Sequence, residues 1–139
     1  MIAVDSSAIV SLGLREPGWE RIKEVLTTDK FAVGWPSVLE SHIVLRAKGI
    51  DRAEVLMKDL LAMPTAAPIA FGPDHYIRAE IAYRRFGKGN GHPARLNFGD
   101  CMAYAVAQEL DAPLLFKGDD FSKTDVDIHP ASVFDQSGI

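Results

Sequence analysis

The sequence predicts an α/β fold, a three-layer α/β/α sandwich with a mainly parallel central sheet. Short apolar runs of strand length alternate along the chain with segments that have the 3.6-residue apolar period of helices. This alternation is typical of parallel sheets, because the chain must cross back over the sheet, usually through a helix, between parallel strands. The chain has 139 residues, which is the size of one ordinary domain, so we expect residues 1–139 to form a single domain.

The first half of the chain predicts two buried strands and four helices. Proline or small polar residues mark the helix starts, and polar residues or glycine mark the ends. In order, we expect a strand at 2–4, a helix after the small-residue turn Ser6–Ser7, a helix from Glu16–Pro17 to about Leu26, a strand at 31–33, a helix from Pro36 to about Lys48, and a helix from Asp51 to about Met63.

The second half continues the alternation and adds a loop rich in glycine. Its central element is a helix that is apolar apart from Asp100 in its first turn. In order, we expect a linker at 64–68, a strand at 68–71, a helix at 74–86, a mobile loop at 87–93, a helix within 96–110, a strand at 114–116, a small edge strand at 124–128 and a frayed tail at 135–139.

Bulk composition excludes several classes of protein. A net charge of −4 argues against a protein that coats nucleic acid non-specifically, although a local basic patch could still bind phosphates. The single cysteine, Cys101, is expected to be buried filler, and it excludes a disulfide framework and a cysteine-cluster metal site. We expect a cytoplasmic protein, because there is no basic leader and no apolar run near the roughly 20 residues of a membrane span.

Acidic residues recur where predicted elements begin or end. Asp5 ends the first strand, Glu40 lies at the edge of a helix's apolar face, Asp100 begins a helix, and Asp119 and Asp120 follow the last core strand. Each acid alone has an ordinary explanation as a helix cap, a turn residue or a solvated side chain. Together they predict a site for Mg²⁺, with Mn²⁺ as an alternative, in which Asp5, Asp100, Asp119 and Asp120 are candidate ligands and Glu40 a further candidate catalytic acid.

Such a site suits hydrolysis of a phosphodiester. An ion held by carboxylates activates water, binds a phosphate oxygen and neutralises the leaving 3′ oxygen, so no side-chain nucleophile is needed. No Ser-His-Asp order or phosphate-binding glycine loop is evident in the sequence, and no Cys or His pair has the spacing of a zinc site.

A basic segment leads into the Asp100 helix. Between Tyr76 and Arg95, five cations face a single acid, Glu80. We predict that four of them contact RNA phosphates, while polar groups nearby contact bases or ribose. The predicted phosphate contacts are Arg84, Arg85, Lys88 and Arg95, and the polar candidates are Tyr83, Asn90 and His92. A solvated amphipathic helix followed by a flexible loop explains the same pattern, and this alternative stays open.

Four stretches resemble the PIN-domain ribonucleases, in particular the VapC-type toxins of bacterial toxin–antitoxin pairs. They are IAVDSSAIV, PSVLESHIVL, ARLNFGDCMAYAVA and LLFKGDDFSKTDV. The resemblance implies a PIN-like fold, RNA cleavage that depends on Mg²⁺ or Mn²⁺, a homodimer, and inhibition by a VapB-type antitoxin that inserts a segment and a basic residue into the site. Asp5, Glu40 and Asp100 match three acids of the family. Many relatives have Asn-Asp at the fourth position, which favours Asp120, while Asp119 remains a candidate.

Two other classes of function fit parts of the pattern. A phosphoacceptor signalling domain also combines an α/β fold with clustered acids, and Lys117 resembles its late lysine, but the first strand offers only one acid where that class has two. A non-catalytic PIN-like module that binds protein would be suggested by missing acids, and none is missing here.

Overall fold

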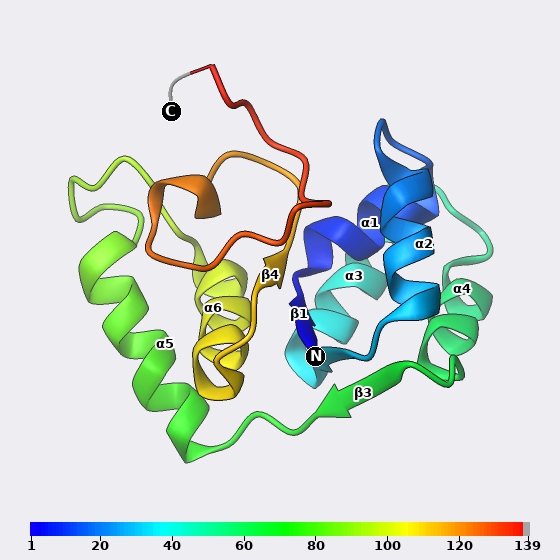
Figure 1. Ribbon diagram of the computed structural model, residues 1–139, viewed down its shortest axis with the longest axis horizontal. Coiled ribbons are helices and arrows are strands. Elements are labelled where there is room, and N and C mark those ends of the chain that lie inside the picture. The colour runs from blue at the N-terminus through cyan, green and yellow to red at the C-terminus, as the bar shows by residue number, and fades with distance from the viewer. Residues whose placement is uncertain (138–139) are drawn as a thin grey trace.

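Four parallel strands form one central sheet. The computed structural model describes residues 1–137; the last two residues of the predicted tail, 138–139, lie outside them. The strands are β1 (Ile2–Val4), β2 (Phe31–Gly34), β3 (Ala66–Ile69) and β4 (Leu114–Leu115), in the spatial order β3-β2-β1-β4 (Figure 1). Every pairing is parallel, so the predicted fold class is confirmed.

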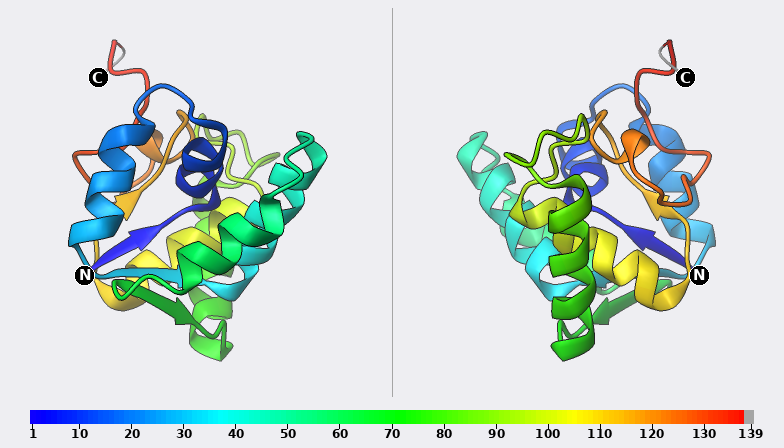
Figure 2. Two further views of the ribbon diagram at one scale, coloured as in Figure 1. Left: turned by 90° about the vertical axis from the view of Figure 1, so that its right-hand side faces the viewer. Right: turned by 90° about the vertical axis from the view of Figure 1, so that its left-hand side faces the viewer.

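Helices cover both faces of the sheet (Figure 2). Their bounds are α1 (Ser6–Leu14), α2 (Trp19–Thr28), α3 (Trp35–Ala47), α4 (Ala53–Leu61), α5 (Pro73–Phe86) and α6 (Phe98–Leu110), followed by a short 3₁₀ turn, η1 (Phe121–Lys123). Within residues 1–137, no helix combines the length and the apolar character that a bilayer crossing needs.

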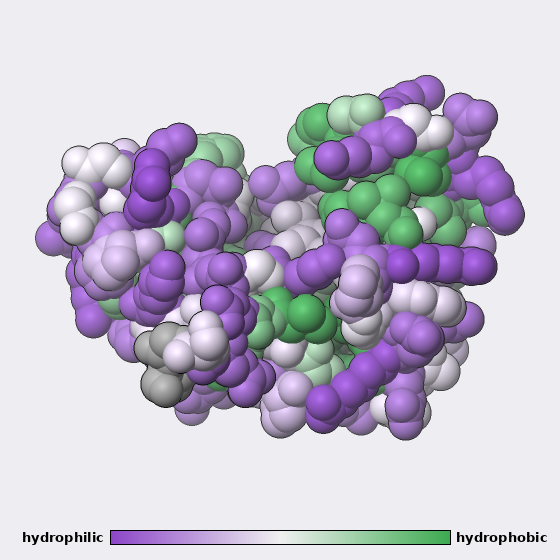
Figure 3. Space-filling model, turned by 90° about the horizontal axis from the view of Figure 1, so that it is seen from above, coloured by the Kyte–Doolittle hydropathy of each residue, from purple (hydrophilic) through white to green (hydrophobic). Residues whose placement is uncertain are grey.

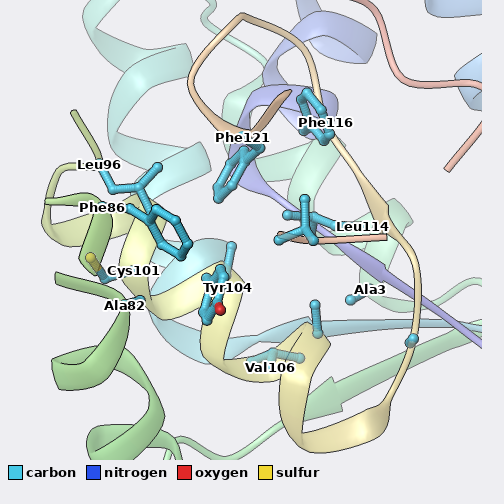
Figure 4. Close-up of a cluster of buried hydrophobic side chains, with 14 of the residues drawn as sticks. Ala3, Ala82, Phe86, Leu96, Cys101, Tyr104, Val106, Leu114, Phe116 and Phe121 are labelled. Atoms are coloured by element: carbon cyan, nitrogen blue, oxygen red, sulfur yellow. The ribbon is translucent and has the colours of Figure 1, made fainter. Parts of the chain in front are cut away.

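Each strand divides its side chains between two cores. Ile2 and Val4 pack with apolar residues of α1, α2, α3 and α4, whereas Ala3 packs with residues of α5 and α6. This follows from the pleat, which points successive side chains to opposite faces. In the second core, Phe86 of α5 and Tyr104 of α6 lie near one another beside the sheet (Figure 4). Cys101 is buried there, as predicted.

The topology places the carboxyl ends of the strands at one edge. β1 lies between β2 and β4. After β1 the chain adds β2 and then β3 on one side of β1, and it adds β4 on the other side only near the C-terminus. In open α/β sheets, ligands bind outside the carboxyl ends of the strands at such a reversal of order. Asp5, the residue after β1, occupies this position.

Several predicted boundaries are wrong by about two residues; the helix predicted from Asp51 to about Met63, for example, runs from Ala53 to Leu61. β3 covers 66–69 rather than 68–71: Pro68, which was expected to begin the strand, lies inside it. An edge strand tolerates proline, whose missing N–H would break a central ladder. The second helix begins at Trp19 rather than at Glu16–Pro17, because Gly18 takes a left-handed conformation, with φ +94°, and holds the preceding residues in a turn.

The predicted edge strand at 124–128 is also wrong. Only Ile128 forms an isolated bridge, to Leu114. Two backbone hydrogen bonds form this bridge, from the Leu114 N–H to Asp127 O and from the His129 N–H to Leu114 O. The residues before the bridge are held by side chains: Asp125 accepts hydrogen bonds from the Tyr104 hydroxyl at 2.6 Å and from Arg85 at 3.1 Å. These contacts attach the segment to α5 and α6 instead of extending it along the sheet.

Candidate active site

Asp5 is a buried acid that caps α1. Only 3% of it is exposed, and its Oδ2 accepts a hydrogen bond from the Ser7 N–H at 3.0 Å. Its Oδ1 is buried and has no hydrogen-bond partner within residues 1–137. The pKa of Asp5 is raised to about 6, mainly by burial; the Ser7 hydrogen bonds oppose the rise and the negative charge of Glu40 adds to it.

Asp100 combines capping with a second set of interactions. Its N–H donates to Asn97 Oδ1 at 2.9 Å, and its Oδ2 accepts from the Asn97 N–H at 3.0 Å, which forms a capping box for α6. Burial raises the pKa of Asp100 to about 7, the Asn97 hydrogen bond opposes the rise, and the charges of Asp5, Asp120 and Glu40 add to it. Asp100 therefore does cap α6, but capping does not explain why three other acids lie close enough to raise its pKa.

Glu40 reaches the other acids from α3. Its Oε1 accepts a hydrogen bond from the Ser6 hydroxyl at 2.6 Å, across 34 positions in sequence. Its carboxylate also lies against Gly99, at the position a Cβ of that residue would take. Ser6 and Gly99 were not predicted as site residues, because a serine after a strand and a glycine in a helix have common local explanations.

The two neighbouring acids after β4 differ in their contacts. Asp119 Oδ1 accepts a hydrogen bond from the Asp135 N–H at 2.8 Å, and this bond anchors the start of the predicted tail, so Asp135 is not frayed. Asp120 is the one whose charge raises the pKa of Asp100. Asp120 is thus close enough to Asp100 to act on it electrostatically, whereas Asp119 contacts the C-terminal segment.

The acids are near one another without forming a closed cage. Within residues 1–137, no group of three or more His, Cys, Asp or Glu side chains is arranged to hold a metal ion. Even so, the charge of Glu40 raises the pKa of Asp5, the charges of Asp5, Glu40 and Asp120 raise the pKa of Asp100, and Asp5 has an unpartnered buried oxygen. Hard oxygen donors whose charges repel one another fit a divalent cation, which would neutralise them.

The predicted phosphate contacts divide into paired and unpaired cations. Arg84 pairs with Glu80 at 2.6 Å, and Arg85 pairs with Asp125. Lys88 and Arg95 are exposed and form no ion pair within the described part of the chain. Arg95 has a positive φ of 53°, and it projects between two fully buried neighbours, Ala94 and Leu96.

The polar residues of the same segment contact its own backbone. The Tyr83 hydroxyl donates to Lys88 O at 3.0 Å, Asn90 Nδ2 donates to Tyr83 O at 2.6 Å, and His92 Nδ1 accepts from the Ala94 N–H at 3.0 Å. These hydrogen bonds tie residues 83–94 to their own backbone, and the mobility expected at 87–93 stays a prediction. Lys117 pairs with Glu16 at 3.3 Å rather than with an acid of the cluster, which weakens the phosphoacceptor alternative.

Comparison with known proteins identifies the family. The family model described as PIN domain matches residues 2–127. The chain belongs to the PIN-domain family. Among curated PIN-domain relatives, Ribonuclease VapC42 of Mycobacterium tuberculosis is 40% identical over 126 residues, which cover 88% of this chain and 95% of the relative. Ribonuclease VapC of Mycolicibacterium smegmatis is 36% identical, covering 90% of this chain and 97% of that protein.

A solved toxin structure has the same fold. The crystal structure of Mycobacterium tuberculosis VapC20, a toxin that cleaves the sarcin–ricin loop, matches with a TM-score of 0.73 at 17% identity and covers 94% of this chain and all of that one. The likeness confirms the PIN-like three-layer architecture.

Proposed function

We propose that this PIN-domain protein is the endoribonuclease toxin of a toxin–antitoxin pair. The observation that supports this most is that four acids from separate segments, Asp5, Glu40, Asp100 and Asp120, lie near one another at the carboxyl edge of the sheet. The charges of the other three raise the pKa of Asp100. The 34–40% identity to VapC ribonucleases over most of the chain supports RNA as the substrate.

Asp5, Asp100 and Asp120 would hold Mg²⁺ or Mn²⁺, with Asp119 as a further candidate. The bound cation supplies Lewis acidity, which lowers the pKa of an attacking water and neutralises charge on the leaving 3′ oxygen. The protein's own contribution is to fix these carboxylates. Capping hydrogen bonds hold one oxygen of Asp5 and one of Asp100, and burial keeps Asp5 at low dielectric.

This proposal is tested by cleavage of a long single-stranded RNA by purified protein with Mg²⁺, with Mn²⁺ and with EDTA. We expect cuts in either metal and none in EDTA. Circular dichroism in all three buffers is the control for folding. Equal cleavage in EDTA and in Mg²⁺ by folded protein would overturn the metal-dependent mechanism.

The two acids after β4 should respond differently to loss of charge. We expect Asp120→Asn to lower the cleavage rate about 10²-fold or more, because a neutral amide no longer compensates a cation at the reacting phosphate. Asp119→Asn keeps an oxygen that accepts the Asp135 N–H, so it should retain most activity. Single-turnover cleavage rates of the two variants show which acid is needed for cleavage. A larger loss of rate in Asp119→Asn than in Asp120→Asn would assign the role of the fourth acid to Asp119.

The unpaired cations should contribute more to RNA binding than the paired ones. We expect Lys88→Ala with Arg95→Ala to weaken binding and to reduce the slope of log K against log salt by about 1.4, since each phosphate contact to a single strand contributes about 0.7. Arg84→Ala with Arg85→Ala should change the slope less, because Glu80 and Asp125 already compensate these charges.

The measurement is equilibrium binding of single-stranded RNA at several salt concentrations, with Ca²⁺ in place of Mg²⁺ to slow cleavage. The two double variants remove the same charge and serve as controls for each other. A larger change from Arg84 and Arg85 would mean that RNA displaces their acidic partners.

A cognate antitoxin of the VapB type is the proposed partner. The chain resembles the toxin–antitoxin complex from Klebsiella pneumoniae, with a TM-score of 0.69 and 13% identity, covering 96% of this chain and 99% of that one. An apolar groove of about 630 Å³ between α1, α2 and α4 offers a docking surface; Leu12, Trp19, Leu56 and Met63 are among its lining residues. Hydrophobic side chains gather on that side of the molecule (Figure 3). Co-purification with the protein encoded beside it, and loss of cleavage on binding, test this partner.

We also propose that the protein forms a homodimer. Large apolar side chains are exposed on α3 and α5, among them Leu39, Ile43, Tyr76 and Ile77. Leu39 and Ile43 line one groove with the exposed Phe98 of α6, and an exposed apolar patch of this kind is typical of a protein–protein interface. Light scattering on the antitoxin-free protein measures the mass, and a monomer at micromolar concentration would contradict the proposal.

A further inference from the structure

Glu40 keeps its place among like charges although no cation holds it there. It forms no ion pair with Lys, Arg or His within residues 1–137, and the charges of Asp5 and Asp100 oppose it. A glutamate on a helix surface is free to turn its carboxylate into solvent. Something other than ion pairing therefore fixes this side chain.

Ser6 supplies the first constraint. It is the buried first residue of α1, directly after Asp5, and its hydroxyl donates to Glu40 Oε1 at 2.6 Å. A hydroxyl that donates to an ionised carboxylate forms a short bond of about twice the strength of a neutral one. The strand end that positions Asp5 thus also positions Glu40 on the neighbouring helix.

Gly99 makes the second contribution: because it has no side chain, it leaves room for the Glu40 carboxylate. A Cβ at this position would overlap Glu40 Oε2 and lie 2.7 Å from both Cδ and Oε1. Gly99 lies in helix α6 and has no positive φ, so its backbone does not require glycine. Alanine is a better helix former than glycine, so helix formation alone does not favour glycine here either. The residue is explained by the space that it leaves for the carboxylate, next to Asp100.

We propose that Ser6 and Gly99 are positioning residues that fix the Glu40 carboxylate against the first turn of α6, between Asp5 and Asp100, before a divalent cation binds. This inference rests on the proposed function. Fixing the side chain in advance removes the entropy that ordering it on binding would cost. Ser6 and Gly99 act through Glu40 and need no contact with the cation or the RNA.

The first test is titration of Mn²⁺ into the metal-free protein by calorimetry. We expect Ser6→Ala and Gly99→Ala each to weaken Mn²⁺ binding about tenfold, the usual effect of losing a group that orients a metal-site residue. Gly72→Ala is the matched control, because a Cβ there meets nothing within 4 Å, and it should bind as wild type does. Wild-type affinity in both Ser6→Ala and Gly99→Ala would overturn the proposal.

The second test asks whether both residues act through Glu40. In a Glu40→Ala background, Ser6→Ala should have no further effect on Mn²⁺ affinity or on cleavage, and Gly99→Ala should raise the melting temperature because the carboxylate is gone. Losses that add in full to that of Glu40→Ala would contradict a shared action.

A double-mutant cycle of Ser6→Ala and Glu40→Ala on the free energy of unfolding, in EDTA, needs neither metal nor RNA. Non-zero coupling supports the Ser6–Glu40 contact, and zero coupling overturns it. If wild-type protein binds no Mn²⁺ and cuts no RNA while the coupling persists, the proposed function fails and the positioning of Glu40 stands.

Discussion

Replacing Asp100 by asparagine is expected to lower RNA cleavage by about 10³-fold, the size of effect produced by losing several kcal/mol of stabilisation at the reacting phosphate. Asparagine keeps an oxygen that accepts the Asn97 N–H, so the cap of α6 survives. The variant should therefore be folded, and its loss of activity should report the missing charge rather than a disrupted helix.

Asp111→Asn is the matched control for this variant. Asp111 ends the same helix in an exposed left-handed conformation, with φ 49°, which asparagine also adopts readily. It removes the same charge from the far end of α6 and should leave cleavage within about twofold of wild type. Cleavage by Asp100→Asn at the wild-type rate would show that the acid cluster is not the catalytic site.

The second large expected effect concerns stability, which should fall in EDTA as the pH rises from about 4 to 8. The folded protein holds protons on Asp5 and Asp100 up to pKa values of about 6 and 7, whereas the unfolded chain releases them near 3.8. Between these values the folded state binds more protons, so deprotonation favours unfolding. For Asp100 the loss is about 2 kcal/mol, because one pKa unit corresponds to about 1.4 kcal/mol and partial exposure screens much of the shift.

Urea unfolding at pH 5 and pH 8 measures this effect. Asp100→Asn should be more stable than wild type at pH 8, and the difference between them should shrink at pH 5. Mg²⁺ should stabilise wild type at pH 8, because it binds only the folded state, while KCl of equal ionic strength should not. An equal gain from Mg²⁺ in Asp100→Asn would place cation binding elsewhere.

The local pattern of the sequence predicts the sheet and the acids at its edge. The apolar runs at 2–4 and 31–33 match β1 and β2 closely, and a strand that stops at an acid places Asp5 without any knowledge of the rest of the chain. Asp100 follows in the same way, from its place in the first turn of an apolar helix. Short-range periodicity and capping determine these positions, and both can be read from neighbouring residues.

Contacts between distant segments could not be predicted in this way. Ser6 meets Glu40 across 34 positions, and Asp119 is distinguished from Asp120 only by its bond to Asp135. The edge strand predicted at 124–128 failed for the same reason: only one bridge to Leu114 forms, and Asp125 contacts α5 and α6 instead of pairing along the sheet.

The cations show the same limit. Charge along residues 76–95 predicts a basic surface, but the sequence does not tell which arginines already have acidic partners. The pairing of Arg84 with Glu80 at (i, i+4) was open to prediction from helical spacing, whereas the pairing of Arg85 with Asp125 was not. The unpaired Arg95 is the clearest remaining candidate for a phosphate contact.

The most direct measurement of the central claim is the chemistry of the RNA ends that the protein produces. Antitoxin-free protein is incubated with total cellular RNA and Mg²⁺, beside EDTA and Asp100→Asn controls, and new ends are mapped by sequencing before and after phosphatase or kinase treatment. When water attacks the phosphorus and the bond to the 3′ oxygen breaks, the fragments carry 3′-hydroxyl and 5′-phosphate groups. We expect discrete cuts with these ends that require both the metal and Asp100. Cuts that persist without either, or that leave 5′-hydroxyl and cyclic-phosphate ends, would contradict hydrolysis at the acid cluster.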